Sequence, residues 1–137
     1  MAVVTPDEIA HTARGVLAKY PDVRVALLFG SQARGTARDN SDIDIALVGG
    51  GDDTLKIGGE LGASLKRDID IVSLENPPIP LLENIARDGQ VIYERSSGNG
   101  AMWRSRTLAM LEIDLPWFDR MADAWLPHVA KRGVTNG

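Results

Sequence analysis

The chain has 137 residues, of which 44% are apolar and 25% are charged, a length and composition that fit one globular domain and exclude a disordered or fibrous protein. Its formal net charge of −4 comes without a cluster of Lys and Arg, which argues against strong binding to nucleic acid. It contains no cysteine, so disulfides and thiolate metal sites are excluded.

The N-terminal segment, Met-Ala-Val-Val-Thr-Pro, lacks the basic residues and the apolar run of a signal peptide. The longest strongly apolar stretch, about Val25–Phe29, is too short to cross a membrane. We therefore expect a cytoplasmic protein with no membrane partner. The first element should be an amphipathic helix over Thr5–Tyr20, because Pro and acidic residues occupy its first turn and apolar residues recur at helical spacing.

The next elements alternate between strands and helices. In chain order they are a strand at Val23–Phe29, a turn of helix and a loop at 31–41, a strand at Asp42–Val48, a helix at Thr54–Lys66, a strand at Asp68–Leu74, a short helix around Leu81–Arg87 and a last strand at Gln90–Tyr93. This order predicts a small α/β (α+β) domain, in which a mixed sheet of about four strands has helices on one face and a catalytic site on the other.

The C-terminal part differs in composition. The run Ser96–Gly100 is typical of a linker, and we divide the chain into a domain at 1–97 and a linker with a helical extension at 98–137. The extension should be interrupted or kinked at Pro116. One stripe of it is apolar: Leu108, Leu111, Leu115, Phe118, Ala122 and Trp125. The stripe packs on the chain's own sheet or, alternatively, docks a partner or a second copy.

The strand at Asp42–Val48 carries the first chemical signal. Alternate side chains of a strand share a face, so Asp42 and Asp44 should project together while Ile43 and Ile45 point into the core. Two neighbouring carboxylates repel one another unless a cation lies between them. Oxygen-only ligands favour Mg²⁺ or Mn²⁺ over zinc.

The second signal is Gly30-Ser31, directly after the first strand. A glycine there lets backbone N–H groups approach an anion, and the Ser31 hydroxyl adds a donor, so this turn is a candidate phosphate site. Arg38 and Arg34 in the following loop are candidate phosphate contacts. Gly30 and Gly35 have the spacing of a P-loop, but Thr36-Ala37 follow where that motif needs Lys and then Ser or Thr.

The whole pattern, Gly30-Ser31, ten residues and then Asp42-x-Asp44, resembles the signature of the polymerase β-like nucleotidyltransferases. The resemblance covers about residues 5–95 and is closest to the minimal nucleotidyltransferases. It implies that Asp70 completes the metal-binding carboxylates Asp42 and Asp44, although Asp68 lies on the same face two residues earlier and is an alternative. It also implies two Mg²⁺ ions, ATP as substrate, and binding of the triphosphate by Gly30, Ser31 and Arg38.

Minimal nucleotidyltransferases are often antitoxins that transfer AMP to a tyrosine of a HEPN-family RNase toxin. The resemblance therefore implies such a toxin as a separate partner chain, and leaves the homo- or hetero-oligomeric state open. Two alternatives remain at this stage. One is nucleotidyl transfer to a small-molecule hydroxyl, as in aminoglycoside-modifying enzymes, and the other is neutralisation of a toxin by binding alone.

Overall fold

The computed structural model describes residues 4–35 and 42–125, and from residue 113 on it describes the backbone alone. Four strands form one mixed sheet: β1 (Val25–Phe29), β2 (Ile43–Val48), β3 (Ile69–Ser73) and β4 (Gln90–Glu94). Their order in space is β3-β2-β1-β4. β1 is antiparallel to β2 and β4, whereas β2 and β3 are parallel. The predicted fold class and the four strands are confirmed.

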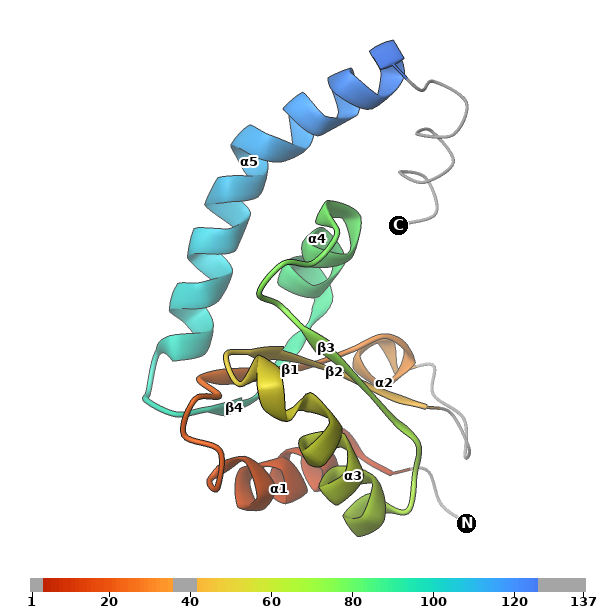
Figure 1. Cartoon of the computed structure of the whole chain (residues 1–137), viewed down its shortest axis with the longest axis vertical. Coiled ribbons are helices and arrows are strands. Elements are labelled where there is room, and N and C mark those ends of the chain that lie inside the picture. Colours follow the sequence, from red (N-terminus) through yellow and green to blue (C-terminus); the bar gives the residue numbers. More distant parts are fainter. Residues whose placement is uncertain (1–3, 36–41, 126–137) are drawn as a thin grey trace.

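Helices α1 (Pro6–Leu17) and α3 (Thr54–Leu65) cover one face of the sheet and lie side by side (Figure 1). α1 begins where the sequence predicts, because the Thr5 hydroxyl accepts a hydrogen bond of 3.1 Å from the Glu8 N–H and caps the helix. α3, preceded by the short 3₁₀ helix η1 (Gly51–Asp53), forms the crossover that the parallel pair β2 and β3 requires. Side chains with no exposed surface fill the space between these helices and the sheet: Ile9, Leu17, Leu28, Ile43, Ile45, Leu47, Ile57 and Leu61.

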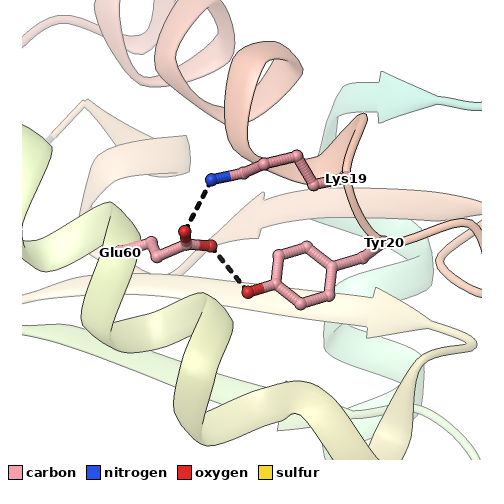
Figure 2. A network of polar contacts seen from close by, with 3 residues as sticks. All are labelled: Lys19, Tyr20 and Glu60. Atoms are coloured by element: carbon pink, nitrogen blue, oxygen red, sulfur yellow. Dashed lines mark hydrogen bonds and ion pairs between the residues drawn. The ribbon is translucent and has the colours of Figure 1, made fainter.

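A polar network joins the end of α1 to α3 at the edge of this core (Figure 2). The Lys19 ammonium and the Tyr20 hydroxyl each donate to the Glu60 carboxylate, at 2.6 Å in both cases. These bonds lower the pKa of Glu60, with the Lys19 bond as the larger cause, and the bond to Glu60 raises the pKa of Tyr20 to about 12. The network therefore fixes the relative position of the two helices.

The other face of the sheet is partly covered by α4 (Ile79–Asp88) and α5 (Asn99–Trp125). Ile85 and Trp103 pack there against strand residues that include Val25, Leu27 and Ala46. The expected placement of helices on one face thus holds for α1 and α3 but not for α4 and α5. The physical reason is that β1 and the second half of β2, Ile45–Val48, are apolar at successive positions, so both of their faces need cover there.

α5 begins at Asn99, inside the segment predicted as a linker, because the Asn99 side chain accepts a hydrogen bond of 2.8 Å from the Ser96 N–H. It continues through Pro116 as one helix, and its axis bends along its length (Figure 1). The first two residues of the predicted stripe, Leu108 and Leu111, pack beside α4, and the side chains of the other four lie outside the described residues. None of the helices in residues 4–35 and 42–125 is long and apolar enough to span a membrane.

Candidate active site

The parallel register of β2 and β3 brings two of the predicted acids together. Asp44 is paired with Asp70, and paired residues of adjacent strands point to the same face, with the strands about 4.8 Å apart. Because Ile43 and Ile45 are fully buried under α1 and α3, Asp44 must project to the opposite face. Asp44 is half-buried and Asp70 is exposed. Asp70 therefore stands beside Asp44 on the outer face and does not point into the apolar interior.

The other two acids lie one step further along the same face. Asp42 directly precedes β2 and Asp68 directly precedes β3, and both are exposed. The Ile43 N–H donates to the Asp68 carbonyl at 3.0 Å, so the pairing of the two segments extends to this position. Asp42 and Asp68 thus lie at the same end of the β2 and β3 pair as Asp44 and Asp70, and Asp70 is the acid paired with Asp44.

The turn after β1 approaches the same place. Phe29 at the end of β1 is paired with Asp44, so Gly30 follows directly beside it. Gly30 has a φ of +73°, and a Cβ built on it would overlap the Oδ2 atom of Asp44. A residue with a side chain would be both strained and obstructed here. The glycine thus lets the turn lie against the Asp44 carboxylate.

The turn continues into a very short helix, α2 (Ser31–Arg34), whose first residue is the half-buried Ser31. The predicted contact Arg38 lies outside the described residues, and the side chain of Arg34 is not described. The sequence gives no indication of a role for Gln90, yet its side-chain amide donates to the Ala33 carbonyl of α2 at 3.0 Å. No local sequence signal could have shown this contact, because it joins residues 57 positions apart.

The residues present fit a hard cation. Among the described residues no group of three or more His, Asp or Glu side chains is placed to hold a metal ion, so the predicted trio of Asp42, Asp44 and Asp70 is not assembled in this structure. Mg²⁺ does not require one, since it is usually held by one or two carboxylates together with substrate phosphates and water. Asp44 and Asp70, paired across adjacent strands and adjoining a glycine turn, supply such a pair.

The chain is similar to known proteins over most of this structure. Residues 12–98 match the family described as polymerase beta, nucleotidyltransferase. A protein adenylyltransferase MntA of Shewanella oneidensis is 32% identical over 79 residues, which make up 53% of this chain and 55% of that protein. The matched region thus spans about half the length of that relative.

Two solved structures share the fold. A toxin–antitoxin structure with AMP-PNP has a TM-score of 0.71 and 22% identity, covering 84% of this chain and 96% of that chain. A structure described as a tri-AMPylated Shewanella oneidensis HEPN toxin in complex with MNT antitoxin has a TM-score of 0.67 and 18% identity, covering 88% of this chain and 98% of that chain. At these identities the likeness supports the fold alone.

Proposed function

The chain belongs to the polymerase beta nucleotidyltransferase family, and from this premise we propose that it transfers AMP from ATP to a tyrosine hydroxyl of a HEPN-family RNase toxin, as the antitoxin of a pair. The observation that carries the proposal is the pairing of Asp44 with Asp70 beside the Gly30 turn. The name of the Shewanella relative, a protein adenylyltransferase, supports a protein as the acceptor. ATP as substrate agrees with the solved toxin–antitoxin structure that contains AMP-PNP.

Asp42, Asp44 and Asp70 would hold Mg²⁺, which when bound neutralises the triphosphate and the charge that develops as pyrophosphate leaves. The backbone N–H groups and the hydroxyl of the Gly30-Ser31 turn donate hydrogen bonds to phosphate oxygens, and Arg38 adds a positive charge. Asp70 accepts the proton of the attacking tyrosine hydroxyl. The hydroxyl oxygen forms a bond to the α-phosphorus, and the bond from that phosphorus to the pyrophosphate oxygen breaks.

The acceptor comes from a second chain. In this proposal residues 1–97 form the nucleotidyltransferase domain, residues 98–137 form a linker and helical extension, and the acceptor hydroxyl belongs to a tyrosine of the toxin. Three of the four carboxylates at the end of β2 and β3, those of Asp42, Asp68 and Asp70, are exposed. A protein that carries the target tyrosine can therefore reach them. Both chains would meet in the cytoplasm, where ATP is present.

The decisive experiment incubates the purified chain with Mg²⁺, ATP labelled at the α-phosphate and the product of the adjacent gene. We expect label on a tyrosine of that product, located by mass spectrometry, and a loss of labelling when Mg²⁺ is chelated. The Asp42→Ala/Asp44→Ala double variant should lose labelling by a factor on the order of 10² or more, because preorganised charges carry this kind of reaction. Asp52→Asn, at an exposed acid outside the site, is the matched control and should label normally.

Two outcomes would contradict the proposal. A toxin that is neutralised equally well by the folded double variant would show that binding alone suffices. Label that appears on a small-molecule hydroxyl and never on the adjacent product would identify a different acceptor class.

A further inference from the structure

Helix α2 has little structure of its own to hold it in place. It contains only four residues, Ser31–Arg34, and its end is closed by a hydrogen bond from the Gly35 N–H to the Ser31 carbonyl. A helix this short is not stable by itself, and the carbonyls of its last turn have no partners within the helix. The position of α2, and with it the position of Ser31, must be set by groups from elsewhere in the fold.

Gln90 supplies one such group. It is the first residue of β4 and is paired with Leu28 in β1, two residues before Gly30. Its Nε2 donates to the Ala33 carbonyl at 3.0 Å, at the C-terminal end of α2. The bond therefore joins α2 to β4, on the far side of β1 from Asp44, while Gly30 lies against the Asp44 carboxylate on the other side.

The backbone that carries Gln90 is itself fixed by the long C-terminal helix. Arg104 on α5 donates its Nε to the Ala86 carbonyl at 2.9 Å and a guanidinium N–H to the carbonyl of Gly89, the residue before Gln90. Arg104 is half-buried and Gly89 is buried, so this connection is shielded from solvent. Because these hydrogen bonds from Arg104 fix the backbone between α4 and β4, they also fix the position of the Gln90 backbone.

From these contacts we propose that Gln90 is a positioning residue for nucleotide binding, which acts by holding α2 so that the Gly30-Ser31 turn can receive the triphosphate. The proposal rests on the proposed function, which assigns the triphosphate to that turn. Gln90 does not touch the nucleotide, so its effect falls on affinity for ATP and leaves the chemical step nearly unchanged.

The test measures binding of the Mg²⁺ complex of α,β-methylene ATP, an analogue that adenylyl transfer cannot cleave, to the full chain by calorimetry. Gln90→Met keeps the length of the side chain but removes the donor, and should raise the Kd by about threefold to tenfold, the range for one hydrogen bond. Gln90→Glu places a carboxylate against the Ala33 carbonyl and should raise the Kd further. Gln90→Lys restores a donor and, in about 0.3 M salt to screen its added charge, should bind within about twofold of the unaltered chain.

Transfer kinetics separate positioning from simple damage to the fold. Gln90→Met should raise the KM for ATP by a factor similar to the change in Kd, while kcat changes by less than about twofold. Val91→Thr, an isosteric change at the next residue of β4, is the matched control and should alter neither constant. Thermal unfolding of each variant verifies that it is folded at the temperature of the measurements.

Four outcomes would overturn the inference. If Gln90→Met binds the analogue as well as the unaltered chain, Gln90 has no positioning role, and the proposed function still stands. If Gln90→Lys loses as much affinity as Gln90→Met, or if kcat falls at constant KM, the hydrogen bond is not the cause. If the unaltered chain does not bind the analogue at all, the proposed function fails first and this inference fails with it.

Discussion

The two faces of the sheet differ in what covers them and in what they can do. The face under α1 and α3 holds a continuous cluster of side chains with no exposed surface, closed at its edge by the network of Lys19, Tyr20 and Glu60. The opposite face is covered by α4 and α5 over only part of its area, and it carries Asp44 and Asp70 at its open end. One face is closed over an apolar core, and the other leaves acidic side chains accessible.

Strand β2 contributes side chains of a different kind to each face of the sheet. In β2 the residues alternate Ile-Asp-Ile at the start, so one strand contributes apolar side chains to the closed face and a carboxylate to the open one. Substitutions on the two faces should therefore separate stability from activity.

The closed face is tested most strongly by Leu61→Ala, which removes a fully buried side chain of α3. We expect it to lower the free energy of unfolding by about 2–5 kcal/mol, through lost burial and a residual cavity, as measured by urea denaturation. Transfer of AMP per folded molecule should be unchanged. If Leu61→Ala is too unstable to measure, Ile57→Val is a milder change in the same cluster. Reduced activity in folded Ile57→Val would contradict the expectation that this face contributes to stability alone.

The open face is tested by Asp70→Ala. Loss of this carboxylate should reduce the rate of transfer by a factor on the order of 10², because a preorganised charge is lost where charge develops. The thermal midpoint should not fall, since the residue is exposed and adjoins another acid. Asp68→Ala, on the same face two residues earlier, is the matched control. A larger rate loss in Asp68→Ala than in Asp70→Ala would identify Asp68 as the third ligand.

The Gly30-Ser31 turn, which should affect both stability and activity, is tested by Gly30→Ala. Because φ is +73° and a Cβ would overlap Asp44, we expect a loss of stability of about 1–3 kcal/mol together with a fall in activity. Gly35→Ala is the matched control, since Gly35 also has a φ of +73° but, among the described residues outside its own helix and chain neighbours, no atom lies within 4 Å of its Cβ position. Equal activity losses in the two variants would mean that backbone strain alone, and not contact with Asp44, is the cause.

The smallest effect concerns the polar network at the edge of the closed face. The pKa of Glu60 is lowered in the folded chain, so its contribution to stability is present above its ordinary value of 4.5 and is lost as the pH falls through the lowered pKa. The pKa of Tyr20 is raised from 10.0 to about 12, so its contribution is present below pH 10 and is lost as the pH rises towards 12.

Glu60→Gln should therefore lower the Tm by at most a few degrees at neutral pH, because the carboxylate is partly exposed and the pair is screened. The gap in Tm between Glu60→Gln and the unaltered chain should narrow in acid. A gap that is constant from pH 3 to pH 7 would show that ionisation of Glu60 contributes nothing.

Local sequence patterns were sufficient to predict the type and order of the first helix and the strands. The Thr5 cap predicts the start of α1, and the apolar run at β1 and the alternation at β2 and β3 predict these strands within two residues of their observed bounds. Helix α1 ends at Leu17, three residues before the predicted end at Tyr20. The packing of α4 and α5 on the second face could not be predicted, because it depends on contacts between segments far apart in the chain. The start of α5 at Asn99 was missed because composition alone suggested a linker.

For the candidate site, the sequence was sufficient to predict the Gly30-Ser31 turn and the acids of two Asp-x-Asp strands as the chemical groups, since their spacing and residue types are local properties. Only the tertiary structure decided that Asp70, rather than Asp68, is paired with Asp44, because strand register is set by packing on both faces. It also decided that Gln90 reaches α2. A sequence determines the periodicity of each strand, but the neighbours of each side chain depend on how distant segments fold together.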